Sequence, residues 1–321
     1  MPDEPHDAIL DRTLFRTQIA DSFAPQLDLL EQLVNYGTNL LPRCFNSSNR
    51  GIPDTVAILG FLKHAVTSID AIHILSREGS TLACFPHIRS LFEIDLYLRW
   101  IFESDYENRA TGYFVWNIRK KRYWLRCYLE GTPEYAANVG HMQGAPGGDP
   151  QIPHTQQEIQ AAIAQEDGKL NCSETAHVNS LFDQYVSNSG KDAEWYRPSG
   201  ATSIRDMAVR LGDEAMYKVF YSQYSQLTHG LSLDHQLHFN APSSEVIFDH
   251  IRTLNALDHV FQMTFTYAMG VFRHCLSRYR PGELDAFARK YIEEWRTPAR
   301  SIPQVTKDGS TFTVSPPQTG N

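Results

Sequence analysis

Apolar residues recur at intervals of three and four along most of the chain, and strict alternation of apolar and polar residues is scarce. The first spacing is typical of amphipathic helices and the second of half-buried strands. The predicted helices lie near residues 14–41, 56–75, 82–102, 106–129, 203–211, 213–229, 244–279 and 281–295. Pro25 is expected to bend or split the first of them. The pattern therefore predicts an all-α protein, an antiparallel bundle of long helices without internal repeats.

Two regions interrupt the helical pattern. Residues 141–154, HMQGAPGGDPQIPH, are rich in Gly and Pro, which is typical of a flexible loop. Thr155 and Glu158 then have the spacing of a capping box, which predicts a short helix after them. Four segments are expected: bundle helices in 1–130, a flexible insertion with short helices in 131–203, the remaining bundle helices in 204–297, and a tail in 298–321. The tail is rich in Pro, Ser, Thr and Gly, so it is expected to be disordered.

The charge balance is acidic. With 29 Lys and Arg against 37 Asp and Glu, the formal net charge of the 321-residue chain is −8. This argues against a protein that coats nucleic acid, although it leaves room for a local basic patch. Five cysteines without a C-x-x-C pair fit a reducing compartment. The N-terminal residues do not read as a signal peptide, and no apolar run approaches the ~20 residues that span a bilayer. We expect a cytoplasmic protein with no membrane partner.

A polar pair stands inside the apolar helix expected at 82–102. Arg89 and Glu93 are four residues apart and share a face, with Tyr97 one turn further on. Because the helix is apolar on most sides, some of these polar groups are expected to be buried, where opposite charges pair. Two interpretations stay open. The pair either fixes the packing of the helix, or it holds an anion at a functional site.

A second polar stripe lies on the helix expected at 213–229. Tyr217, Tyr221, Ser225 and His229 follow one another at intervals of four, where a core face would be aliphatic. These side chains donate, accept and exchange protons near neutral pH. The stripe is either a satisfied hydrogen-bond network between helices or a site in which His229 is the acid or base and Arg89 binds an anion.

The motifs R-S-L-F-E (89–93) and Y-x-x-x-S-x-x-x-H-G (221–230), with W-Y ahead of the second, resemble a bacterial all-helical family, domain of unknown function 5677. The resemblance covers roughly residues 50–280 apart from the insertion. The family's bundle is similar to HEPN-type ribonucleases of toxin and phage-defence systems, which carry an arginine, a short spacer and a histidine on one helix. Here the helix with His229 has no arginine at that spacing. Arg252 and His259 fit an R-x6-H pattern, and Arg89 is the candidate to replace the missing arginine.

A basic, aromatic segment lies in the helix expected at 106–129. Its cations are Arg119, Lys120, Arg122 and Arg126, interleaved with Trp116, Tyr123, Trp124 and Tyr128. Cations combined with aromatic rings bind phosphate backbones and stack on bases. The alternative is the solvated face of an amphipathic helix whose aromatic rings enter the core.

No phosphate-binding or dinucleotide-binding glycine motif, no serine-hydrolase elbow and no H-E-x-x-H motif is present, so we expect no cofactor and no metal. Two function classes remain. The first is a binding module for a small anionic ligand or a protein, expected as a homo-oligomer. The second is a metal-independent, HEPN-like ribonuclease. In it His229 is the acid or base, Arg89 steadies the phosphate, and Glu93 orients Arg89. Tyr221 and Ser225 supply hydrogen bonds, and the basic helix guides an RNA strand.

Overall fold

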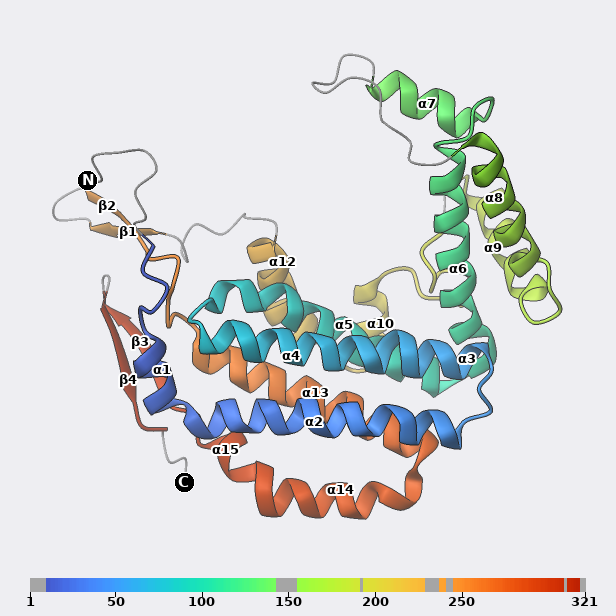
Figure 1. Ribbon diagram of the computed structural model, residues 1–321. Coiled ribbons are helices and arrows are strands. Elements are labelled where there is room, and N and C mark those ends of the chain that lie inside the picture. The colour runs from blue at the N-terminus through green and yellow to red at the C-terminus, as the bar shows by residue number, and fades with distance from the viewer. Residues whose placement is uncertain are drawn as a thin grey trace. The chain divides into compact units, whose positions relative to one another are not determined.

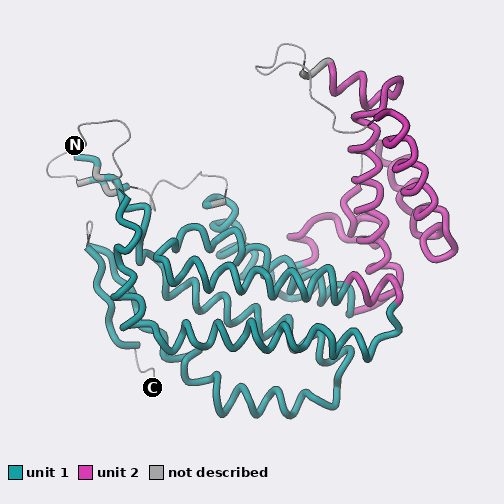
Figure 2. The backbone as a smooth tube through the Cα atoms, viewed as in Figure 1, with its two compact units in different colours: residues 1–50, 57–102, 208–321 teal, residues 51–56, 103–207 magenta. Residues whose placement is uncertain are grey.

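The computed structural model describes residues 10–142, 155–190, 193–228, 237–240, 245–308 and 311–317. Most of these residues are helical, which confirms the all-α fold class (Figure 1). The chain forms two compact units, which are described separately (Figure 2). The first comprises residues 1–50, 57–102 and 208–321, and the second comprises residues 51–56 and 103–207. The helix at 106–126 thus falls in the second unit, together with the segment that we expected as an insertion.

The first unit is a helical bundle. Its long helices are α2 (Ala24–Ser47), α4 (Lys63–Arg77), α5 (Phe85–Glu103) and α13 (Leu257–Tyr279). The shorter helical elements are α1 (Arg16–Ser22), η1 (Val56–Leu62), η2 (Thr81–Cys84), α11 (Glu214–Met216), η3 (Tyr217–Tyr221), α12 (Ser222–Thr228), η4 (Pro281–Glu283), α14 (Leu284–Lys290), η5 (Tyr291–Trp295) and α15 (Arg296–Arg300). The chain divides at Phe23, next to Pro25 in the first turn of α2, where the N–H that proline lacks would have no helical partner.

The long helices of this unit pack closely where a residue lacks a side chain. A Cβ atom on Gly37 of α2 would lie 2.5 Å from Cγ2 of Val66 on α4 and 2.9 Å from Cζ of Phe272 on α13. Both neighbours are buried. Only glycine therefore fits at this contact, since any larger side chain would push three helices apart.

Two antiparallel hairpins extend the first unit. Strands β1 (Leu237–Asn240) and β2 (Glu245–Phe248) form one, and β3 (Gln304–Asp308) and β4 (Thr311–Ser315) form the other. The helix predicted to begin near residue 244 therefore begins only at Leu257, because 245–248 is a run of β-branched and aromatic residues that pairs as a strand. Within the segment expected as a tail, residues 304–315 pair as a hairpin and Phe312 packs on Phe15 at 5.4 Å between ring centroids.

The second unit is a small helical cluster. Its helices are α3 (Ile52–Thr55), α6 (Tyr106–Arg126), α7 (Pro133–Met142), α8 (Gln156–Leu170) and α9 (Ala176–Ser189), and α10 (Ile204–Arg210) follows at its boundary. Its core forms where apolar residues of α6, α8 and α9 meet, including Val115, Leu170 and Phe182. The predicted capping box is present, because Thr155 and Glu158 each bond to the other's backbone N–H.

One helical stretch among the described residues, Ile52–Arg77, is long and apolar enough to cross a bilayer by length and composition alone. The sequence pattern had not predicted this, because Lys63, His64 and Asp70 interrupt the run. However, 56% of its most apolar window is buried inside the protein. Core helices of soluble proteins meet the same criterion, so the absence of a membrane partner stays a prediction.

Candidate functional site

Arg89, Glu93 and Tyr221 form one hydrogen-bonded cluster between two helical segments of the first unit. Arg89 and Glu93 face the same side of α5, where Arg89 Nε donates to Glu93 Oε1 at 3.0 Å. Tyr221 comes from η3, and its hydroxyl accepts from Arg89 Nη2 at 2.9 Å and donates to Glu93 Oε1 at 2.9 Å. The predicted pair on α5 is therefore completed by the tyrosine predicted from the other helix. We call these three residues the Arg89 cluster.

The segment that carries Tyr221 is held beside α5 by a second set of bonds. Arg99 of α5 binds the carboxylate of Asp213 and donates from Nη2 to the carbonyl of Leu211 at 2.6 Å. The chain then passes through the π-helical turn η3, and such turns re-aim the side chains that they carry. The hydroxyl of Tyr221 bonds to α5, whereas the hydroxyl of Tyr224, three residues later, bonds to α13 while its ring packs on Phe85 of α5.

Aromatic rings surround the Arg89 cluster. The guanidinium of Arg89 lies over the ring of Tyr221 at 4.9 Å from its centroid, and the ring of Tyr217 stacks on that of Tyr221 with centroids 4.9 Å apart. Burial, followed by the charge of Glu93, raises the pKa of Tyr221, so the phenol keeps its proton at neutral pH and serves as a donor to Glu93. Burial opposes the charge on Arg89, but Tyr221 and Glu93 outweigh it and raise the pKa of Arg89. The cluster thus contains a fixed cation.

Part of this cation remains open. The side chain of Arg89 is 24% exposed and that of Glu93 is 23% exposed. Nε and Nη2 of Arg89 are engaged, whereas Nη1 has no partner among the residues that the structure describes. The second carboxylate oxygen of Glu93 is 3.5 Å from the hydroxyl of Tyr97. The guanidinium is therefore held along one edge and free along the other.

The two other residues proposed for the site from the predicted stripe are Ser225 and His229. Ser225 lies on α12, one turn after Tyr221, and is partly exposed. His229 lies outside the described residues, so its predicted role as acid or base stays a prediction. The cluster brings together a guanidinium, a carboxylate and a phenol.

A second cluster, which the sequence reasoning did not predict, joins η3–α12 to α13. The hydroxyl of Tyr224 and Nε2 of His259 share a hydrogen bond of 2.5 Å, and Phe220 stacks on the imidazole with centroids 5.3 Å apart. Burial lowers the pKa of His259. The R-x6-H spacing had pointed to this histidine, but not to its tyrosine partner. Nε of Arg252, the other member of that pattern, is buried without a hydrogen-bond partner among the described residues.

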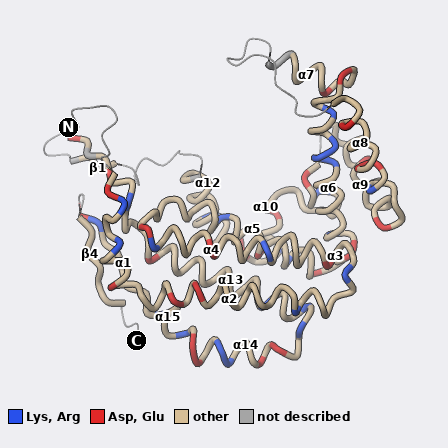
Figure 3. Tube along the Cα trace, in the orientation of Figure 1, with Lys and Arg blue, Asp and Glu red and all other residues tan. Residues whose placement is uncertain are grey.

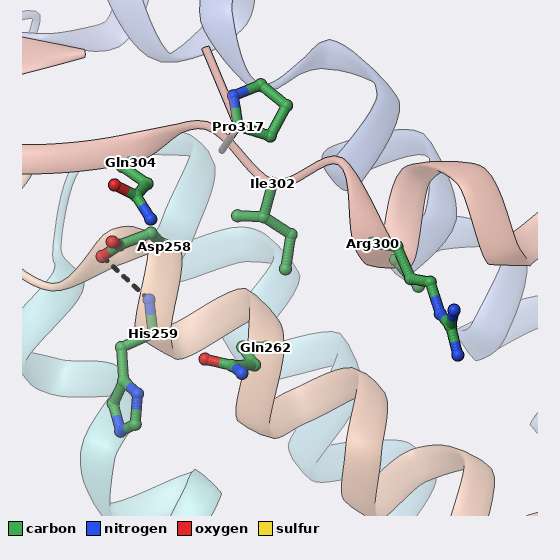
Figure 4. Close-up of a pocket in the computed structure, with 8 residues that line it drawn as sticks. Asp258, His259, Gln262, Arg300, Ile302, Gln304 and Pro317 are labelled. Carbon is green, nitrogen blue, oxygen red and sulfur yellow. Dashed lines mark hydrogen bonds between the residues drawn. The ribbon is translucent and has the colours of Figure 1, made fainter. Parts of the chain in front are cut away.

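A pocket of ≈510 Å³ lies next to this second cluster (Figure 4). The carboxylate of Asp258 already accepts from the backbone N–H groups of His259 at 2.9 Å and Val305 at 3.3 Å. In the close-up, the imidazole of His259 extends away from Gln304, and the guanidinium of Arg300 points away from Asp258. Because its polar groups are engaged or diverge, this pocket is a weaker candidate than the Arg89 cluster.

The basic residues of α6 cross-link the second unit. Lys and Arg gather along α6, with acidic residues on the neighbouring helices (Figure 3). The pairs are Arg119 with Asp183 at 2.7 Å, Lys121 with Glu166 at 2.6 Å, Arg122 with Asp167 at 2.8 Å and Arg126 with Glu134 at 2.9 Å. Lys120 lies 5.6 Å from the ring centroid of Trp116. The basic face of α6 is therefore not simply exposed to solvent, because each of these arginines forms an ion pair with another helix.

Within the described part of the chain, no three His, Cys, Asp or Glu side chains gather closely enough to hold a metal ion. The cysteines described there are unpaired thiols, and burial raises the pKa of Cys44 and Cys84 to about 12. Thiols with so high a pKa are poor nucleophiles at neutral pH. Neither thiol is therefore a candidate nucleophile.

Comparison with known proteins identifies a family for this chain. The sequence model of a family of unknown function (DUF5677) matches residues 55–245, which is more than half of the chain. This range contains the Arg89 cluster, Ser225 and the whole of α6. No curated protein and no solved structure matches the chain. The family match says nothing of HEPN-type domains, so that likeness stays a prediction. The chain belongs to the family of unknown function DUF5677.

Proposed function

We propose that this protein is a helical binding module that holds a small anion, a carboxylate or a phosphate, at Arg89. One observation carries the proposal: the guanidinium is fixed by Glu93 and Tyr221, while Nη1 has no partner among the described residues and a quarter of the side chain is exposed. Glu93 and Tyr221 are positioning residues in this proposal. They act on the ligand through the orientation of Arg89.

The chemistry follows from the shape of the guanidinium. Arginine presents its N–H groups in a planar fork that matches two oxygens of a carboxylate or phosphate. Here the fork is already ordered by two partners, so binding loses less side-chain entropy than at a free surface arginine. Glu93 neutralises part of the charge, which lowers affinity for any single anion. The expected ligand is therefore small and is recognised by geometry as well as by charge.

The test is calorimetric titration of the whole protein with phosphate, acetate and short dicarboxylates. Saturable binding of at least one anion is expected for the wild type and for Arg77→Gln, which removes an exposed arginine of α4. Arg89→Gln is expected to weaken it about tenfold, which corresponds to the loss of one charge-assisted hydrogen bond. Arg89→Lys keeps the charge and is expected to weaken it as well, because the fork is lost. Equal affinities for Arg89→Gln and Arg77→Gln would refute the proposal.

A HEPN-like ribonuclease is the second candidate. The observation in its favour is that Arg89 and Tyr221, two of the residues that the nuclease hypothesis names, meet from separate helices. Its acid or base would be His229. Incubation of purified protein with RNA, beside His229→Ala and Arg89→Gln, decides it. Cleavage that both substitutions abolish would support a nuclease, and no cleavage by the wild type would exclude it.

A further inference from the structure

The second unit contains a pocket of ≈430 Å³ whose wall carries three arginines of α6. It is lined by Arg119, Arg122, Tyr123, Arg126, Glu134 and Val186. Arg119, Arg122 and Arg126 follow one another at intervals of three and four, so they share one face of the helix. This volume lies within the ~300–1,000 Å³ range of small-molecule sites. We call it the α6 pocket.

Each arginine of the α6 pocket is anchored at one edge only. Arg119 donates from Nη1 to Asp183 and Asn179, and Arg122 donates from Nη1 to Asp167. Their Nε and Nη2 groups have no partner among the described residues. Arg126 donates from Nε to Glu134 at 2.9 Å, which leaves both of its terminal nitrogens without one.

The anchoring acids matter for the balance of charge. Asp183 and Asp167, which anchor Arg119 and Arg122, are not among the residues that line the pocket. Only Glu134 contributes a carboxylate to the wall itself. A bound anion would therefore meet three ordered guanidinium forks at the cost of little conformational entropy.

Glu134 is the carboxylate of the same wall, and it is already engaged. Burial raises the pKa of this carboxyl, but Arg126 and Arg122 outweigh burial and lower it, so Glu134 is ionised. Its Oε1 accepts from Arg126, whereas its Oε2 is enclosed and has no hydrogen-bond partner among the described residues. An enclosed carboxylate oxygen without a donor is costly. Because no solvent-sized group reaches Oε2, Glu134 acts in this wall as the anchor of Arg126.

Tyr123 gives the pocket wall an exposed aromatic ring. Tyr123 lines the pocket and is 49% exposed, and the neighbouring Trp124 is 60% exposed. The two rings lie edge to face with centroids 5.6 Å apart. Exposed aromatic rings beside cations stack on heteroaromatic rings, which every nucleobase provides. The pocket thus combines a phosphate-binding side with a stacking side.

From this combination we infer that the α6 pocket binds a nucleoside phosphate. The phosphate contacts the free edges of Arg122 and Arg126, and the base stacks on Tyr123. A free nucleotide and the phosphorylated end of an RNA strand share this chemistry. The inference does not rest on the anion site at Arg89, which lies in the other unit.

The experiment titrates the full chain with adenosine monophosphate, adenosine, inorganic phosphate and a short 5′-phosphorylated RNA. Saturable binding of adenosine monophosphate is expected, weakened about tenfold in Arg122→Gln and in Arg126→Gln. Tyr123→Leu should weaken the nucleotide severalfold and leave inorganic phosphate unchanged. If the RNA binds as tightly as the nucleotide, the occupant is a strand end. If it does not, the occupant is a free nucleotide.

Two controls make the result specific. Lys121→Gln removes one positive charge from the same helix at a side chain that is 59% exposed and outside the pocket lining, and it should leave nucleotide binding unchanged. Arg89→Gln should also leave it unchanged, which separates this site from the other. Each variant is checked for an unaltered thermal melt, with Arg126→Lys in reserve because it keeps the charge and loses the fork. Equal weakening by Lys121→Gln, or no binding of the nucleotide by the wild type, would overturn the inference.

Discussion

Replacing Tyr221 with phenylalanine removes one oxygen from the Arg89 cluster and leaves the ring in place. The hydroxyl accepts from Arg89 Nη2 and donates to Glu93 Oε1, both at 2.9 Å. The packing of the ring against Phe92, with centroids 5.4 Å apart, is retained. The substitution therefore isolates two hydrogen bonds to charged partners, without creating a large cavity.

The size of the effect follows from burial. A hydrogen bond to a charged group contributes about 1.5–3 kcal/mol when its partners are enclosed. Arg89 and Glu93 are each about a quarter exposed, so water replaces part of what the hydroxyl supplied. We expect Tyr221→Phe to lower the free energy of unfolding by about 1–2 kcal/mol. This corresponds to a fall in Tm of roughly 1.5–3 °C for a chain of 321 residues.

The assay is denaturant unfolding followed by circular dichroism, combined in a double-mutant cycle with Glu93→Gln. The matched control is Tyr217→Phe on the same π-helical turn, whose hydroxyl has no hydrogen bond to another described residue. We expect the control to change stability by less than about 0.5 kcal/mol. The coupling between Tyr221 and Glu93 is expected to be about 1 kcal/mol. Equal effects of the two tyrosine substitutions, or strict additivity in the cycle, would show that the cluster is not a unit.

Two further predictions concern packing and pH. Gly37→Ala places a methyl group 2.5 Å from Val66 Cγ2, so it should lower the free energy of unfolding by about 1–2 kcal/mol. Gly60→Ala is the control, because nothing lies within 4 Å of its Cβ, and it should not lower the free energy of unfolding. Denaturant unfolding of both variants measures the difference. Because burial lowers the pKa of His259, the unfolded chain takes up the proton first as pH falls below about 6.5, so stability decreases from there downward. His259→Asn should reduce that slope by up to about 1.4 kcal/mol per pH unit, and parallel pH profiles of the two proteins would contradict it.

The long helices could be predicted because each repeats its apolar spacing over several turns. The helices α2, α4, α5 and α6 are examples. The hairpins could not be predicted in the same way. Strands of four or five residues contain too few positions to show a period, and each is defined by its partner strand. This is why the strand at 245–248 was joined to the long helix that begins at Leu257.

The contacts of the candidate site also differ in whether local spacing in the sequence predicts them. Arg89 and Glu93 are four residues apart, so helical geometry alone predicts their pairing. Tyr221 joins them across 128 residues of sequence, and the predicted stripe suggested it only as a hypothesis. Tyr224 and His259 were not predicted as partners, because they are 35 residues apart on separate helices and no local spacing links them.

The basic helix shows why charge along a sequence does not distinguish a structural clamp from a binding site. Spacing predicts that Arg119, Arg122 and Arg126 share a face, but their acidic partners lie in α7, α8 and α9 and become neighbours only on folding. A count of charges there would give near neutrality and suggest no ligand. The guanidinium fork has two edges, however, and a carboxylate on one edge orders the other without occupying it. An arginine in an ion pair can therefore be better prepared for a phosphate than a free one, and whether the open edge faces solvent or a pocket decides between the two roles.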